Sequence, residues 1–267
     1  MEKMKNFSLF LCASLLSVLC LSSCMKIGSV TDGQAVGVAT YGYNNKLILN
    51  STVGPVSAAN LESLGYTAGS CYWFFYSHDA DLPENSQNVI NANGFVTVSI
   101  LDSEEIPKFF LYSSLSDTSA VMPDEIAIIS PFDNNPSYID SHLFMTQAVN
   151  MPNDIQLQWN MSYSPGTMMP TEIEGSRYYD IFIRATKKNE STKTASLVQC
   201  LNAYYIGGYL QNAAQTEKSI LGNNYNASTS TFKLRFNYAS DINAETQKIT
   251  WRSKVTDVAI AGFLPEW

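Results

Sequence analysis

The sequence predicts a mainly β protein, in which a small OB-like, partly open barrel is followed by an antiparallel β-sandwich. Apolar and polar side chains alternate with a period of two in several short segments, as they do in strands that bury one face. Segments that contain Asn, Gly and Pro separate these runs and are typical of turns. Aromatic residues make up 12% of the chain, which supports an ordered core.

Residues 1–23 predict a lipoprotein signal peptide. Lys3 and Lys5 precede the apolar run 7–21, which as a helix would rise only about 22 Å and fall short of the roughly 30 Å hydrocarbon core. A charged start, a short apolar run and small residues at its end are typical of an export signal. The run ends in the four residues of a lipobox, an aliphatic residue, two small ones and a cysteine: Leu21, Ser22, Ser23 and Cys24.

Cys24 is the predicted lipid attachment site. We expect the chain to be cut before Cys24 and its thiol to take up diacylglycerol, so that several acyl chains anchor the protein and residues 24–30 form a tether. The alternative is an ordinary secretory signal with a chance cysteine. No second run of 18 or more apolar residues follows, so no transmembrane helix is expected after the signal.

The rest of the chain divides into two predicted domains, and residues 31–112 form the first, the OB-like unit. Asn44-Asn45 suits a hairpin turn, and Gly65 suits the end of a short helix. The expected elements are strands over 35–43, 46–52, 71–77 and 94–101, a helix over 58–64 and a polar loop over 78–93. An acidic segment over 102–105 is expected at the surface, where the chain leaves the last of these strands.

Residues 113–267 form the second predicted domain, which begins with the Ser- and Pro-containing linker 113–125. Beyond it, three runs alternate clearly enough to predict antiparallel strands with one covered face. One short helix over 209–220 is also compatible with the sequence. The apolar members of the three runs are Ile155, Leu157, Trp159 and Met161; Tyr179, Ile181 and Ile183; and Phe232, Leu234, Phe236 and Tyr238.

Charge argues against nucleic acid as a partner. The net charge of the whole chain is −8. Residues 27–110 contain two basic side chains, Lys46 and Lys108, against eight acidic ones, whereas binding to phosphates requires the reverse.

The loop that begins at His78 is a weak candidate metal site. Its possible ligands are His78, Asp79, Asp81 and Glu84, but the pattern fails that of an EF-hand, so a solvated acidic loop is the favoured interpretation. The chain has two histidines, which excludes a three-histidine site. No cofactor is predicted.

Cys71 and Cys200 are the cysteines that remain after the signal and the anchor are set aside. One disulfide between them is possible in an oxidising compartment. Two buried thiols are the favoured alternative, because Cys71 begins the apolar run CYWFF.

The sequence contains no recognisable catalytic motif. A G-x-S-x-G elbow is absent, so a serine nucleophile of that kind is not indicated. A pair of carboxylates for glycoside hydrolysis stays open, because their spacing is spatial rather than sequential. Tyrosine-rich segments, YYIGGYL (204–210) and YSPGTMMP (163–170), are candidate patches for binding peptide or glycan.

In pattern, the chain resembles the NigD-like lipoproteins of Bacteroidetes, which pair an N-terminal OB domain with a C-terminal β-sandwich. The segments that carry the resemblance are VGVATYGYNNKLILNS, GYTAGSCYWFFYSHDAD, FVTVSILDSEEI and STFKLRFNYASD. The resemblance implies no catalytic residues. Many members carry an acidic stretch behind the lipidated cysteine. This chain has none there, which favours the periplasmic face of the outer membrane over the cell surface.

Together these observations predict a lipid-anchored envelope protein that acts as a non-catalytic binding or accessory module for a protein or glycan partner. One alternative is an envelope hydrolase that acts on glycan or peptide through carboxylates. A further alternative, an immunity-type protein against a toxin, is implied by the resemblance alone.

The anchor is tested by Cys24→Ala. We expect this variant to keep its leader and to lose metabolic labelling with a fatty acid, because the acceptor thiol is gone. Gel mobility and acyl labelling of the purified protein measure both effects, with Cys20→Ala as the matched control. Unchanged labelling of Cys24→Ala would contradict the lipobox assignment.

Overall fold

The computed structural model describes residues 29–42, 45–113, 118–164, 169–243 and 245–264. The predicted signal peptide, Cys24 and most of the predicted tether therefore lie outside the described residues. The chain forms two compact units. The described part of the first comprises residues 29–108 with 137–144, and the second comprises residues 109–136 and 145–264.

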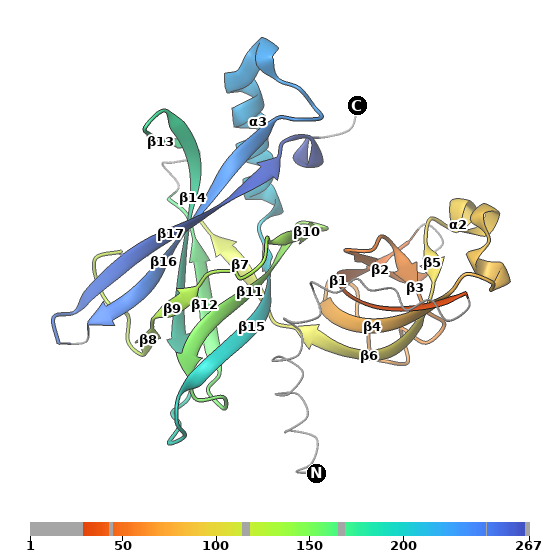
Figure 1. Ribbon diagram of the computed structural model, residues 1–267, viewed down its shortest axis with the longest axis horizontal. Coiled ribbons are helices and arrows are strands. Elements are labelled where there is room, and N and C mark those ends of the chain that lie inside the picture. The colour runs from red at the N-terminus through yellow and green to blue at the C-terminus, as the bar shows by residue number, and fades with distance from the viewer. Residues whose placement is uncertain (1–28, 43–44, 114–117, 165–168, 244, 265–267) are drawn as a thin grey trace. The chain divides into compact units, whose positions relative to one another are not determined.

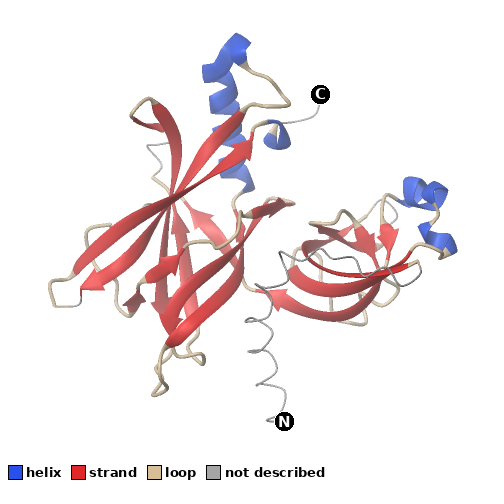
Figure 2. Ribbon diagram, in the orientation of Figure 1, coloured by secondary structure: helices blue, strands red, loops and turns tan. Residues whose placement is uncertain are grey.

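The first unit contains a six-stranded, strongly curved sheet (Figures 1 and 2). Its neighbouring strands are antiparallel except for the short pair β3 and β5, which is parallel. The strand order is β5-β3-β2-β1-β4-β6. The bounds are β1 Val30–Tyr41, β2 Leu47–Ser51, β3 Val56–Ser57, β4 Cys71–Asp79, β5 Val96–Thr97 and β6 Ser99–Ile106.

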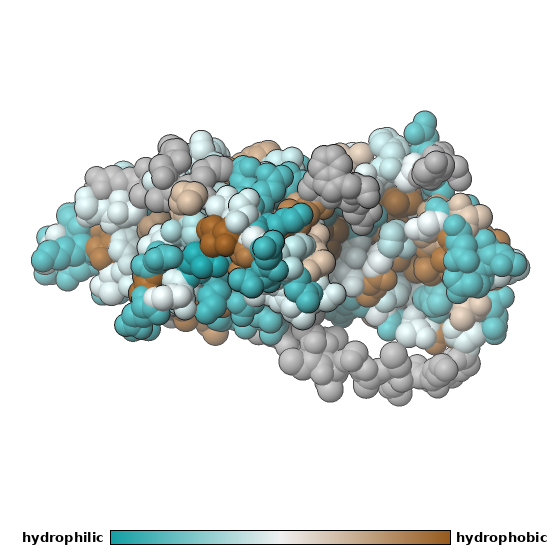
Figure 3. Space-filling view, turned by 90° about the horizontal axis from the view of Figure 1, so that it is seen from above, coloured by the Kyte–Doolittle hydropathy of each residue, from teal (hydrophilic) through white to brown (hydrophobic). Residues whose placement is uncertain are grey.

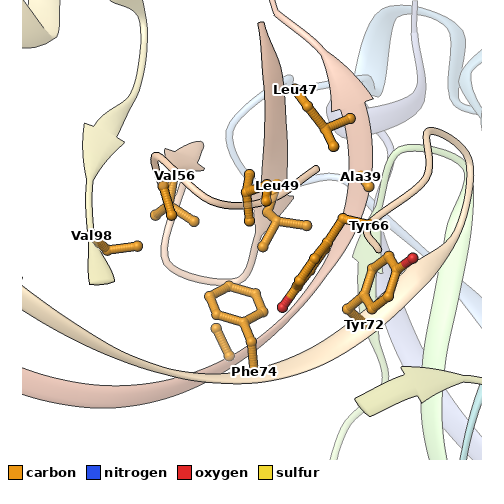
Figure 4. Close-up of a cluster of buried hydrophobic side chains, with 11 residues drawn as sticks. Ala39, Leu47, Leu49, Val56, Tyr66, Tyr72, Phe74 and Val98 are labelled. Carbon is orange, nitrogen blue, oxygen red and sulfur yellow. The ribbon is translucent and has the colours of Figure 1, made fainter. Parts of the chain in front are cut away.

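The core of the first unit lies on the concave side of this sheet. In Figure 4 the labelled side chains converge from β1, β2, β3 and β4 and from the segments that follow β3 and β5. Tyr66 stacks on Tyr72 with ring centroids 4.1 Å apart. Because successive side chains of a strand point to opposite faces, Tyr72 and Phe74 share this interior while Cys71 and Trp73 lie on the other side of β4.

Two local predictions for the first unit are wrong. Residues 59–65 form turns instead of the predicted helix over 58–64, and in this conformation Leu61 is buried in the core. The predicted loop 78–93 contains the 3-10 turn η1 (Pro83–Asn85) and the helix α2 (Gln87–Asn93). Gly94 ends α2 at a φ of 75°, which favours glycine.

The acidic run also differs from its predicted place. Asp102, Glu104 and Glu105 lie within β6, where Glu104 is opposite Trp73 of β4, rather than beyond the end of a strand. β6 is the last strand of the sheet order. Charges on an edge strand discourage pairing with other chains, which explains their presence there.

The second sheet has eleven strands, and its main path is β10-β11-β15-β7-β12-β14-β16-β17. Two of its pairs, β7 with β12 and β14 with β16, are parallel, so the prediction of a purely antiparallel sheet is wrong at these places. The bounds are β7 Lys108–Tyr112, β8 Glu125–Ile126, β9 Ile128–Ser130, β10 Ser137–Ile139, β11 His142–Met151, β12 Leu157–Ser162, β13 Thr171–Ile173, β14 Ser176–Lys187, β15 Ser196–Tyr205, β16 Thr231–Asn243 and β17 Lys248–Ala259.

Helices are few in the second unit. The helix α3 (Gly207–Leu221) follows β15 and leads into the 3-10 turn η3 (Gly222–Asn224), and η4 (Ala261–Phe263) follows β17. β15 and the 15-residue α3 together connect β14 to β16, which provides the long connection that a parallel pair of strands needs. The mainly β fold predicted from the alternation is confirmed.

The alternating runs identify most of the core of the second unit correctly. Tyr179, Ile181 and Ile183 of β14 are at most 1% exposed, and the same holds for Leu234 and Phe236 of β16. Trp159 and Met161 of β12 are buried as well. These rows share the apolar face of the curled sheet, as period two predicts.

Arg184 breaks this rule, because it occupies a predicted polar position of β14 and yet is only 2% exposed. Its guanidinium holds Glu125 with two hydrogen bonds, Nε to Oε1 at 2.6 Å and Nη2 to Oε2 at 2.5 Å. A third goes to the carbonyl oxygen of Ala120 at 2.7 Å. The pair therefore fastens β8 and the segment before it to β14, where Glu125 is already paired with Thr186.

We expect Arg184→Met to lower the free energy of unfolding by about 3–5 kcal/mol, because it leaves the Glu125 carboxylate buried without a counterion. Adding Glu125→Leu should restore much of the loss, since it removes the uncompensated charge. Urea unfolding followed by circular dichroism measures both effects. The control is Lys193→Met, which breaks the exposed pair with Asp154 and should change the free energy by about 1 kcal/mol or less. Equal effects of Arg184→Met and Lys193→Met would contradict the structural role of Arg184.

Candidate functional site

The candidate site is a groove of about 590 Å³ in the first unit. It lies over the end of the β1–β2 hairpin, and its volume is in the range of sites that hold small ligands or side chains. The lining residues are Val38, Ala39, Thr40, Tyr41, Gly42, Ile48, Asn50, Pro55, Gly69, Asn93, Gly94 and Asp140.

Two cross-strand pairs form the floor of the groove. Val38 of β1 is opposite Asn50 of β2, and Thr40 is opposite Ile48, so these four side chains share the face of the hairpin that points away from the core. Val38 is 3% exposed and Ile48 is 7% exposed, whereas Tyr41 at the end of β1 is 60% exposed. The groove thus has an apolar floor and two polar neighbours, and Tyr41, the partner of Leu47, belongs to its lining at the end of β1.

Asp140 enters the lining from a distant part of the sequence. It forms the two-residue turn between β10 and β11 with Ser141, and both residues have positive φ, 45° and 66°. Such a turn matches the twist of a hairpin, and Asp tolerates this backbone conformation better than most residues. The Nδ2 group of Asn50 donates a hydrogen bond of 2.5 Å to Oδ2 of Asp140. The carboxylate is therefore held in place by both its backbone and Asn50.

His142 follows the Asp140 turn and does not line the groove. Burial lowers the pKa of this imidazole, and its Nδ1 lies 2.7 Å from the carbonyl oxygen of Asp140. The ring thus contacts the backbone of the turn through Nδ1.

The predicted metal loop does not gather its four candidate ligands into a metal site. Across residues 29–264, in the parts that the structure describes, no group of three His, Cys, Asp or Glu side chains is arranged to hold a metal ion. Asp79, at the end of β4, accepts hydrogen bonds from the Asp81 amide (2.9 Å) and the Ser29 hydroxyl (2.8 Å), which lower its pKa. His78 lies on β4 beside it, Asp81 follows the strand, and Glu84 lies in η1.

Cys71 and Cys200 carry thiols rather than the possible disulfide. Cys71 is fully buried on the convex side of β4, and this burial raises the pKa of its thiol to about 12. A thiol in this state is a poor nucleophile, because the thiolate is the reactive form. Cys200 lies in β15 and is half-buried.

Three carboxylates of the second unit that are buried or partly buried are each bound by an arginine. Glu217 of α3 accepts hydrogen bonds from Arg177 and from the Tyr179 hydroxyl. Asp180 of β14 accepts two hydrogen bonds from Arg235, at 2.5 and 2.7 Å. Together with Glu125, these groups form ion pairs that brace the sheet, an arrangement unlike the acid and nucleophile of a glycosidase.

The tyrosine-rich candidate patches are only partly exposed. In YYIGGYL, Tyr204 is fully buried, whereas Tyr205 is 46% exposed. The ring centroids of Tyr205 and Phe110 lie 6.1 Å apart. Part of YSPGTMMP, residues 165–168, lies outside the described residues. On the face drawn in Figure 3, hydrophobic residues form separate patches among hydrophilic ones. Isolated exposed apolar residues of this kind are normal on a protein surface.

The ionisation of Asp180 makes the stability of the fold depend on pH. Burial opposes ionisation of this carboxyl, but hydrogen bonds from Arg235, Asn237 and Thr171 outweigh it and lower the pKa. A carboxyl with a lowered pKa stabilises the fold above its unfolded pKa of 3.8, and this contribution is lost as the pH falls through the folded value.

We therefore expect Asp180→Asn to destabilise the protein by about 2 kcal/mol at pH 7 and by progressively less as the pH falls below 4. Thermal unfolding across this range measures the effect, and Asp257→Asn, on an exposed position of β17, is the control. A difference between wild type and Asp180→Asn that stays constant down to pH 2 would contradict the role of the charge.

The comparisons with known proteins concern both the first unit and the whole chain. Residues 28–104 match the family model described as a lipoprotein OB domain. The chain gives no match among curated proteins. Among the described residues, no helix is long and apolar enough to cross a membrane.

Solved structures share the fold of the whole chain. An uncharacterized protein from Parabacteroides merdae is 21% identical, with a TM-score of 0.69 over 85% of this chain and 99% of its own. A candidate lipoprotein from Bacteroides fragilis is 10% identical, with a TM-score of 0.54 over 86% of this chain and 98% of its own. A NigD-like immunity protein from Bacteroides caccae is 7% identical over 85% and 93%, and at its TM-score of 0.43 the likeness carries no inference.

These findings agree with the resemblance drawn from the sequence and identify the first unit. Residues 28–104 are similar to the OB domain of a Bacteroidetes lipoprotein family, and the chain as a whole shares its fold with proteins of Bacteroidales.

Proposed function

We propose that the protein is a lipid-anchored envelope protein that acts as a non-catalytic binding or accessory module for a protein or glycan partner. The groove in the first unit is its binding site. Cys24 is the anchor, in the lipobox formed with Leu21, Ser22 and Ser23, and the site of action is the periplasmic face of the outer membrane.

The makeup of the groove carries this proposal. Its described lining contains one carboxylate, from Asp140, and neither a histidine nor a cysteine. A hydrolase needs at least a nucleophile or base and a second group that assists it. An apolar floor with a few oriented polar groups is instead the usual makeup of a recognition site.

The lipoprotein match supports the location. Its range starts at residue 28, four residues behind the predicted attachment site, so the OB unit would follow the anchor almost directly. A binding module tied closely to a membrane meets partners in the same envelope at a high local concentration. The lack of an acidic stretch behind Cys24 is the reason to prefer the periplasmic face.

The groove is tested by Tyr41→Ala. We expect wild-type protein to retain a stoichiometric partner when it is purified from native envelope, and Tyr41→Ala to lose most of it, because Tyr41 belongs to the lining of the groove and is 60% exposed. Tyr112→Ala is the matched control, since Tyr112 is a 50% exposed tyrosine of β7 in the second unit. Equal recovery of the partner with both variants would contradict a role for the groove. Turnover of a peptide or glycan library by wild-type protein would contradict the non-catalytic assignment.

A further inference from the structure

We propose that the groove takes the side chain of a lysine or arginine presented by a partner polypeptide. The inference rests on the proposed binding function and goes further by naming the chemistry that is recognised. It depends on three features of the groove: an unneutralised carboxylate, a set of hydrogen-bond acceptors beside it, and an apolar floor that leads to it.

The Asp140 carboxylate is the charged group of the groove. It forms no ion pair with any described residue, and its one side-chain partner, the amide of Asn50, is neutral. Glu125, Asp180 and Glu217, by contrast, are each bound by an arginine of the same unit. Asp140 is held rigidly by its turn and by Asn50, so it is an oriented anion that lacks a cation.

The groups around Asp140 favour a donor. Asn50 uses its Nδ2 group on Asp140, which leaves its carbonyl Oδ1 as an acceptor on the same side of β2. Thr40 adds a hydroxyl to the lining. An ammonium or a guanidinium carries only donors, three and five respectively, and so suits a cluster of acceptors better than a carboxylate or a phosphate does.

The floor suits the stem of such a side chain. Lysine and arginine carry three or four methylene groups that pack on apolar surface while the charged end stays accessible. Val38 and Ile48 provide this surface on the same face as Asn50.

The two described lysines of the first unit have partners other than Asp140. The Nζ atom of Lys46 lies 4.9 Å from the centre of the Phe95 ring, and Lys108 donates a hydrogen bond of 2.7 Å to the carbonyl oxygen of Gly69. At longer range, the net charge of −8 attracts a basic partner and repels an acidic one. Charge complementarity thus favours a basic polypeptide over an anionic glycan.

The test is fluorescence polarisation with the full chain in detergent and a set of labelled pentapeptides that differ only in the central residue. Arginine is compared with citrulline, its neutral near-isostere, and lysine with acetyl-lysine. We expect the charged peptides to bind about fivefold more tightly than their neutral counterparts, because a partly exposed ion pair adds a modest amount.

The variants are Asp140→Asn and, as its matched control, Asp124→Asn. Asparagine tolerates the positive φ of both positions, 45° and 55°, and both changes remove one negative charge from an exposed residue. Asp140→Asn should remove the preference for arginine over citrulline, whereas Asp124→Asn should keep it. Thermal unfolding confirms that both variants remain folded.

Three results would overturn the inference: citrulline binding as tightly as arginine, an unchanged preference in Asp140→Asn, or no binding of any peptide. If one of these occurs while Tyr41→Ala still loses its envelope partner, the choice of a basic side chain fails and the binding function stands. If Tyr41→Ala keeps its partner as well, the binding function of the groove fails with it.

Discussion

Both units depend on one constraint, which is that a sheet with one apolar face must cover that face with little help from helices. The chain has one helix longer than two turns among its described residues, so each sheet curves strongly and buries its own interior rows. In the first unit Tyr72 and Phe74 face the interior together with Leu49 of β2. In the second unit β14 and β16 do the same with aromatic and branched side chains. Curvature replaces the second layer that a flat sheet would need.

Polar groups inside these interiors decide how the strands align. Arg184 and Glu125 would be unfavourable in the core if either were alone, so only the register that brings them together is compatible with folding. Gln147 and Tyr204 act in the same way, since both are fully buried and the amide donates a hydrogen bond of 2.7 Å to the hydroxyl. Such pairs exclude alternative registers that apolar packing alone would tolerate.

The groove follows from this architecture. The outer face of the β1–β2 hairpin forms the floor of the groove, and the turn at Asp140 places a carboxylate beside it. In the second unit, by contrast, Glu125, Asp180 and Glu217 each form an ion pair with an arginine, and these pairs hold elements of the unit together. The ion pairs that brace strands thus lie in the second unit, whereas the proposed binding groove lies in the first.

The sequence by itself determined the mainly β class and most of the core. Period-two alternation lies within a single strand, so it can be recognised without knowing which strands pair with it. The rows at Tyr179 and Phe232 were predictable for this reason. Only the tertiary structure decided that residues 59–65 are turns, that Arg184 is buried, and that the groove exists. Asp140 lies 90 residues from Asn50 along the chain, and neither segment contains a sequence pattern that predicts contact with the other. Contacts of this range depend on which strands pair and how the sheet curves, and these are properties of the whole fold.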